Sequence, residues 1–159
     1  MADNRRDTTL TLTDGDGLAR ASSARIAGLL PVRYTDQGLI GTGGMGEVRR
    51  VQDRVLARTV AMKVMRLVLA TSPSARLRFI REAQVTAGLQ HPGIVAVHDQ
   101  GELADGRLWY TMQEVRGETL EAMLPAVPLR RRVEVLARVA QAVGFAHRAS
   151  IIHRDLKPS

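Results

Sequence analysis

The chain has 159 residues, enough for one domain with a sizeable core, and 45% of them are hydrophobic, as in an ordinary globular protein. It contains no cysteine, which excludes disulfide bonds and thiolate metal sites. No apolar run is long enough to span a membrane and the N-terminus lacks the apolar region of a signal peptide, so we expect no membrane segment and a cytoplasmic location.

The net charge of +7 raises the question of nucleic-acid binding, but the distribution of the basic residues argues against it. Arginine accounts for 21 of the 23 basic residues, and these are spread along the chain rather than gathered in one patch. We therefore expect no specific nucleic-acid partner. Lysine occurs only at Lys63 and Lys157. Where lysine is so rare, the two positions that carry it are expected to need a compact ammonium group.

Residues 1–33 are rich in Thr, Asp, Gly, Ser and Ala and include the turn-forming stretch "TDGDG". We expect a mobile arm here, with at most a short helix near residues 24–30. Beyond it, short apolar stretches separated by Gly clusters predict three strands, at about residues 34–40, 46–52 and 59–66.

Ser72 followed by Pro73 predicts the start of a helix, in a segment that Pro92 closes. Two strands joined by a hairpin at "ADGR" are expected next. Helical spacing of apolar residues then predicts a short helix in "RGETLEAML" and a long helix over about residues 128–149. The order is therefore a strand-rich part with one inserted helix, followed by a part that is all helix.

Gly41, Gly43 and Gly46 form a Gly-x-Gly-x-x-Gly pattern, which by itself is a weak signal for nucleotide binding. In dinucleotide-binding folds a helix follows at once, because its N-terminus holds the pyrophosphate. Here "EVRRV" continues as a strand, which favours a glycine-rich hairpin lying over nucleotide phosphates. Val48, two residues after the last glycine, would then pack on a flat base.

Such a hairpin requires a strand with Ala-x-Lys downstream, and "TVAMKVM" supplies it. Strand alternation places Ala61 and Lys63 on one face, the first small enough to admit an adenine and the second able to reach phosphates. Phe79 and Val85 lie three residues to either side of Glu82, which predicts that Glu82 faces inward. Its carboxylate would then pair with Lys63. Taken singly, Lys63 could also be an edge-strand charge and Glu82 a solvated helix residue.

Five segments together resemble a bacterial-type serine/threonine protein kinase: Gly41–Val48, Val60–Lys63, Glu82, His91–Pro92 and His153–Pro158. The resemblance covers about four fifths of the chain. It implies an α+β, protein-kinase-like fold with a five-stranded antiparallel N-lobe, one inserted helix in that lobe, a hinge, and a truncated helical C-lobe.

On this resemblance residues 34–112 form the N-lobe, 113–118 the hinge and 119–159 the start of the C-lobe, which ends inside the catalytic loop. The resemblance also implies ATP and Mg²⁺ as cofactors. The partners it implies are a protein substrate with a Ser or Thr acceptor hydroxyl and, as a further candidate, a second kinase chain in a homodimer.

The resemblance implies, position by position, that Lys63 binds the α- and β-phosphates of ATP and that Glu82 holds Lys63 in place. Asp155 would accept the proton of the substrate hydroxyl or orient that hydroxyl, and Lys157 would neutralise charge on the transferred phosphoryl group. Arg154 is similar to the arginine that pairs with a phosphorylated activation loop.

The resemblance also implies an ATP-binding set. Met112 would be the gatekeeper behind the adenine, and the Gln113 carbonyl and Val115 amide would hydrogen-bond the base. Besides Lys63, the other residues expected to contact ATP are Ile40, Gly41, Thr42, Gly43, Gly44, Met45, Gly46, Val48 and Ala61.

The family holds Mg²⁺ through an Asn that would follow directly after Ser159 and through the Asp of an Asp-Phe-Gly motif, and neither is within these 159 residues. The four histidines have no cysteine or acidic cluster beside them, so we expect no metal ligands in the chain itself. We expect the sequence to be a piece of a longer kinase and residues 1–159 alone to be inactive. The alternative is a short, non-catalytic module that binds nucleotide or docks onto an intact kinase.

Overall fold

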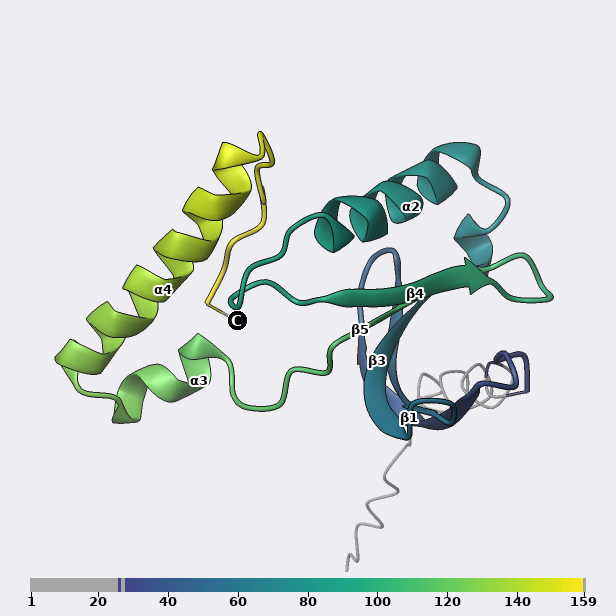
Figure 1. The fold of residues 1–159 in the computed structure, drawn as a ribbon, viewed down its shortest axis with the longest axis horizontal. Helices are drawn as coiled ribbons and strands as arrows, with labels where there is room; N and C mark the ends of the chain where they lie inside the picture. Colours follow the sequence, from purple (N-terminus) through teal and green to yellow (C-terminus); the bar gives the residue numbers. More distant parts are fainter. Residues whose placement is uncertain (1–25, 27, 159) are drawn as a thin grey trace, which may run out of the picture.

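The computed structural model describes residues 26 and 28–158, and it places the sheet with the helix of residues 73–87 at one end and the later helices at the other (Figure 1). The strands are β1 Tyr34–Thr42, β2 Gly46–Asp53, β3 Arg58–Met65, β4 Val97–Glu102 and β5 Leu108–Met112. The helices are the 3-10 turn η1 Leu67–Leu69, α2 Pro73–Ala87, α3 Leu120–Met123, the 3-10 turn η2 Leu124–Ala126 and α4 Leu129–Arg148. The first three strands and the long helix end within two residues of their predicted limits. Of the short helix expected near residues 24–30, residues 24, 25 and 27 lie outside the described residues.

The five strands form one antiparallel sheet in the order β1-β2-β3-β5-β4. The last two strands therefore stand in the sheet in the reverse of their order along the chain, so that β5 rather than β4 lies beside β3. In this register Lys63 is flanked by Val48 on β2 and by Tyr110 on β5. Residues directly opposite each other point to the same face of a sheet, so these three side chains share one face.

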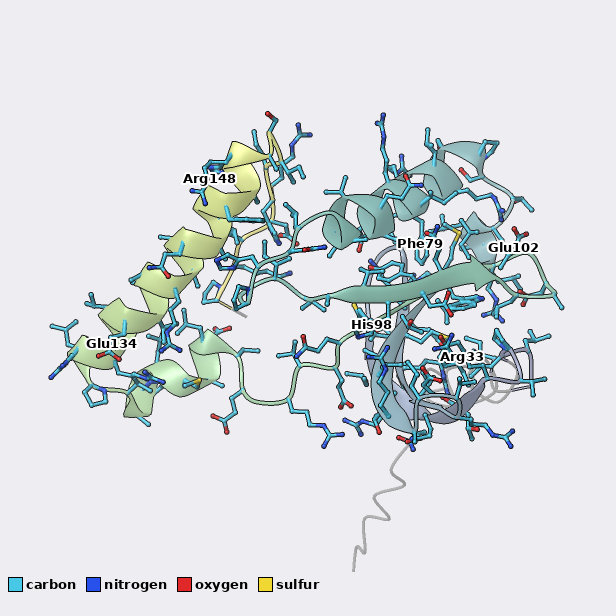
Figure 2. The ribbon with its side chains drawn as sticks, in the orientation of Figure 1. Arg33, Phe79, His98, Glu102, Glu134 and Arg148 are labelled. Carbon is cyan, nitrogen blue, oxygen red and sulfur yellow. The ribbon has the colours of Figure 1, made fainter. Side chains whose placement is uncertain are left out.

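Helix α2 covers that face of the sheet. Its first turn is capped by Ser72, whose Oγ accepts a hydrogen bond from the Ala75 N–H at 3.4 Å, with Pro73 directly after the cap as the sequence predicted. The buried residues of α2 recur every four positions at Ala75, Phe79 and Ala83. Phe79 lies between the helix and the sheet (Figure 2).

The inward position predicted for Val85 is wrong, because Val85 is 38% exposed. The buried stripe of α2 passes through Phe79 and Ala83, and Val85 lies two residues beyond Ala83, which is more than half a helical turn away. Glu82 lies at the edge of the stripe, with its side chain 39% exposed.

The opposite face of the sheet has its own core, which includes part of the segment expected to be a mobile arm. Ile26 is 1% exposed, and Leu29 and Leu30 pack against the same cluster. The other buried members of the cluster are Tyr34, Val51, Val60, Met62, Val64, Leu103 and Trp109. The end of the N-terminal segment is thus continuous with the sheet.

The helical part is more open. Within α4 only Ala146 is buried, whereas Leu129, Val133 and Leu136 are more than half exposed. The His91 and Phe145 rings, 5.2 Å apart, connect the loop after α2 to α4. None of the helices in the described part of the chain is long and apolar enough to cross a membrane.

Candidate active site

The glycine-rich segment forms a hairpin between β1 and β2. Strand β1 ends at Thr42 and β2 begins at Gly46, and the Gly43 N–H donates to the Gly46 carbonyl at 2.8 Å to close the turn. Strand pairing continues with Gly41 opposite Val48. The next element is another strand, so the arrangement is the predicted hairpin and not the strand-turn-helix of a dinucleotide-binding fold.

The hairpin glycines differ in what surrounds them. A Cβ added at Gly41 or Gly44 would meet no atom within 4 Å. A Cβ added at Gly46 would collide with the carbonyl oxygen of Val64 on the neighbouring strand. Protein packing therefore requires glycine at position 46, whereas the open space at positions 41 and 44 leaves room for a ligand to approach the backbone.

Lys63 and Glu82 form the ion pair expected from the sequence. The Lys63 Nζ lies 2.5 Å from Glu82 Oε1 and donates a hydrogen bond to it. Strand β3 supplies the lysine and α2 the carboxylate, so the bond ties the helix to the sheet. The Lys63 side chain is only 19% exposed, which makes this contact stronger than an ion pair on an open surface.

Tyr110 belongs to the same cluster, and reasoning from the sequence missed it. Its hydroxyl donates to the same Glu82 Oε1 at 2.7 Å. The rings of Phe79 and Tyr110 each have their centre 5.7 Å from Lys63 Nζ. Burial, with the hydrogen bond to Glu82, raises the pKa of the Tyr110 phenol above its ordinary value of 10.0, so the phenol stays protonated in mildly alkaline solution as well as at neutral pH. Lys63, Glu82, Phe79 and Tyr110 are called the Lys63 cluster below.

The residues predicted to surround the base lie at the end of β5. Met112 is opposite Ala61 in the β3–β5 pairing and packs partly buried against the core under α2. Residues 113–118 follow without helix or strand. The Gln113 N–H donates to the Ala96 carbonyl at 2.9 Å, and Val115 is 73% exposed.

Glu114, between these two predicted base-binding residues, makes a contact that the sequence reasoning also missed. Its side chain is only 6% exposed, and its Oε1 accepts from Arg50 Nη2 at 2.5 Å and from Arg50 Nε at 2.8 Å. The hydrogen bonds from Arg50 hold the pKa of the Glu114 carboxyl below its usual value. The available signal was that Arg50 follows Val48 by two residues on β2 and so shares its face.

Asp155 and Lys157 lie on the irregular segment after α4. Their side chains are 77% and 60% exposed, and Lys157 Nζ is 3.8 Å from Asp155 Oδ2. The Asp155 N–H donates to His153 Nδ1 at 3.3 Å, and Arg154 has a positive φ of 63°. Within residues 26 and 28–158 no hydrogen bond or ion pair joins this segment to the Lys63 cluster, so the structure does not bring the two halves of the predicted catalytic set into contact.

The polar groups of the site suit an anionic ligand. In the described residues no group of three or more His, Cys, Asp or Glu side chains is placed to hold a metal ion. Two carboxylates of the site are paired with cations, Glu82 with Lys63 and Glu114 with Arg50. An ammonium beside a glycine hairpin with open space along its backbone fits the phosphates of a nucleotide.

Comparison with known proteins agrees with this geometry. Residues 34–159 match the family described as "Protein kinase domain". The serine/threonine-protein kinase PknJ of Mycobacterium tuberculosis is 43% identical over 135 residues, which are 84% of this chain and 23% of PknJ. PknB of Mycolicibacterium smegmatis is 47% identical over 134 residues, which are 80% of this chain and 21% of PknB. Among solved structures, the Mycobacterium tuberculosis PknI kinase domain is similar with a TM-score of 0.65 and 34% identity, covering 83% of this chain and 55% of that one.

The chain thus spans between a fifth and a quarter of the length of these two curated relatives and just over half of the PknI kinase domain. The five-stranded antiparallel sheet with its one inserted helix, followed by the first helices of a second part, is a truncated protein kinase fold. The chain therefore belongs to the bacterial-type serine/threonine protein kinase family and carries the N-terminal part of the kinase domain.

Proposed function

We propose that the protein is an ATP-dependent serine/threonine kinase in which this chain supplies the nucleotide-binding side of the active site. The observation that carries the proposal is the 2.5 Å contact between Lys63 and Glu82, on the strand beside the glycine-rich hairpin. In this role the Lys63 ammonium binds the α- and β-phosphates, and Glu82 keeps it in position. The hairpin backbone lies over the phosphates, in the open space at Gly41 and Gly44.

The adenine would lie between the hairpin strands and the segment after β5. Ala61 provides a small side chain opposite the flexible gatekeeper Met112. The Gln113 carbonyl and the Val115 amide would bind the polar edge of the base. Val48 would pack on its face, together with Ile40, which is 45% exposed and therefore free to make such a contact. Thr42, Gly43 and Met45 complete the hairpin around the nucleotide.

The acceptor side of the reaction is assigned to the segment after α4. Asp155 would orient the Ser or Thr hydroxyl of a protein substrate and accept its proton, and Lys157 would neutralise charge on the transferred group. Both side chains are mostly exposed, which suits groups that meet a protein substrate.

Magnesium, when bound, would neutralise negative charge on the phosphates of ATP. In this family it is held by an Asn and by the Asp of Asp-Phe-Gly, and this chain contains no Asp-Phe-Gly. Because phosphoryl transfer depends on positioning and charge neutralisation, we propose that residues 1–159 by themselves are inactive and that the activity belongs to a longer form. The cytoplasmic location and the kinase homodimer stay predictions.

A non-catalytic module that docks onto an intact kinase is the second candidate. One observation favours it, namely the apolar residues Leu129, Val133 and Leu136 exposed on α4. The mass of the native product, measured with an antibody to residues 34–120, separates the two candidates. A product well above 17.4 kDa supports the longer kinase, and a product at 17.4 kDa supports the module.

The catalytic assignment is tested by Lys63→Met in the native-length protein. We expect transfer of phosphate from ATP to a protein substrate to fall by about 100-fold or more, since one essential charge-stabilising group is lost. Arg66→Met is the matched control, because Arg66 is an exposed basic residue just beyond the same strand. Activity retained in Lys63→Met would overturn the assignment.

A further inference from the structure

We propose that Tyr110 is a positioning residue of this site: its hydroxyl fixes the Glu82 carboxylate in the orientation that holds Lys63. The catalytic consequence rests on the proposed function, whereas the geometry belongs to the chain alone. Tyr110 would act through Glu82 and would touch neither nucleotide nor substrate.

The need for such a residue follows from the exposure of Glu82. Its side chain is 39% exposed at the edge of the buried stripe of α2, so water competes for the carboxylate and the flexible side chain has other rotamers available. A single bond from Lys63 would leave that freedom largely intact. Tyr110 supplies a second donor, at 2.7 Å, to the oxygen that already accepts from Lys63 at 2.5 Å.

Tyr110 is itself held rigidly. Its side chain is buried, with the residue 5% exposed, and its ring packs against Phe79 with centres 5.2 Å apart and planes tilted by 55°. The hydroxyl therefore points to a fixed place in space, at little further entropic cost. The raised pKa of the phenol agrees with this role. A tyrosine that stays protonated keeps its O–H available as a donor to the Glu82 carboxylate and adds no negative charge beside it.

The sheet register explains why two donors meet at one oxygen. Lys63 on β3 and Tyr110 on β5 are direct cross-strand partners, so both reach α2 from the same level of the sheet. Helix α2 is consequently tied to two strands through a single carboxylate. A movement of α2 away from the sheet would break both bonds together, which makes the ion pair a property of the folded sheet and helix.

The chain contains a matched control for this contact. Of its two tyrosines, the other is Tyr34, which is equally buried at 5% exposure and donates to Asp99 Oδ2 at 2.8 Å. Tyr34 lies in the core on the opposite face of the sheet, where its ring contacts Trp109. Tyr34→Phe therefore removes the same kind of hydrogen bond without touching the Lys63 cluster.

The two lysines make the test direct. The whole chain is labelled with a lysine-reactive reagent and the modified peptides are measured by mass spectrometry, with Lys157, 60% exposed, as the internal reference. We expect Lys63 to label more slowly than Lys157 in the natural sequence. In Tyr110→Phe we expect Lys63 to label about fivefold faster, as for the loss of one hydrogen bond, with Lys157 unchanged. Tyr34→Phe should alter neither rate.

A packing role of Tyr110 is separated from a positioning role by making Tyr110→Phe a second time, in a chain that already carries Glu82→Gln. If Tyr110 acts through the carboxylate, Tyr110→Phe changes Lys63 labelling by less than about twofold in that background. The same increase in both backgrounds, or no increase in Tyr110→Phe alone, would overturn the proposal.

A second measurement does not depend on the folding of the Tyr110 variant. In Tyr34→Phe only the Tyr110 phenol remains, and its ultraviolet Raman bands at neutral pH, which respond to hydrogen bonding of the phenol, should change when Glu82 is changed to Gln; unchanged bands would overturn the proposal. Both experiments need neither nucleotide nor activity. A negative result here therefore leaves the proposed function standing, and a negative result with Lys63→Met leaves this geometry standing.

Discussion

The Arg50 guanidinium of β2 holds the Glu114 carboxylate that follows β5, with two nitrogens at 2.5 and 2.8 Å from one oxygen. The two residues are 64 positions apart in sequence, and Arg50 lies opposite Ala61 in the sheet. The contact therefore joins the wall of the proposed adenine pocket to the segment that would bind the edge of the base. Because the Glu114 side chain is 6% exposed, water does not readily replace this partner.

We expect Arg50→Ala to lower the stability of the chain, since it leaves a buried carboxylate without its main donor. Arg116→Ala is the matched control: Arg116 approaches the same carboxylate at 3.3 Å but is 70% exposed. The urea midpoint of unfolding should fall clearly in the first variant and little in the second. Equal losses in the two variants would show that Arg50 is not the main anchor of Glu114.

Replacing Gly46 by alanine should destabilise the hairpin. The added methyl group meets the Val64 carbonyl, so β2 and β3 must separate locally at a cost of about 1–3 kcal/mol. Gly44→Ala, where a Cβ meets nothing within 4 Å, should change the free energy of unfolding by less than about 0.5 kcal/mol. Denaturant unfolding of both variants checks the difference, and similar values for the two would contradict the packing explanation.

Local patterns in the sequence were enough to predict Lys63 and Glu82. Strand alternation placed Ala61 and Lys63 on one face, and the order of the motifs pointed to a carboxylate on the next helix. The buried face of that helix was predicted less well. Val85 was expected to be inward because it lies three residues after Glu82, whereas the buried residues of α2 are spaced four apart.

Tyr110 and Arg50 were missed because their contacts depend on tertiary pairing. Nothing local in the sequence states that β5, and not the preceding β4, lies beside β3, and only that order puts Tyr110 next to Lys63. The partner of Arg50 likewise lies beyond three strands and a helix. The burial of Ile26 was missed because residues 1–33 were judged as a whole by their polar composition, although Ile26, Leu29 and Leu30 recur at helical spacing.

Acid should destabilise the chain through Asp53. This buried carboxylate accepts from Arg33 at 2.7 and 2.9 Å and from the amides of Val55 and Leu56 at 3.1 and 3.2 Å. These bonds, led by that of Arg33, hold the pKa of Asp53 well below its ordinary value of 3.8. The unfolded chain therefore takes up the proton more readily, so this stabilisation is fully present above about pH 3.8 and is lost as the pH falls below it.

We expect Asp53→Asn to be less stable than the natural sequence at neutral pH, because Arg33 loses its closer carboxylate partner and keeps the longer 3.4 Å contact with Asp99, and to lose stability less steeply in acid. Urea unfolding at a series of pH values gives both quantities. Some slope should persist, since the pKa of Asp36 is also lowered, chiefly by hydrogen bonds from Arg49. An acid slope as steep as that of the natural sequence would show that Asp53 does not titrate as its contacts require.

The packing of the N-terminal segment gives the last prediction. Ile26 is 1% exposed in the core that lies on the face of the sheet opposite α2. Ile26→Ala removes buried methyl groups and leaves a cavity, so we expect the free energy of unfolding to fall by about 2–5 kcal/mol. Val32→Ala, at a residue 87% exposed, should change it by less than about 0.5 kcal/mol. If the two variants unfold at the same denaturant concentration, the kinase fold of this chain begins at the first strand, and the segment before it makes no contribution to stability.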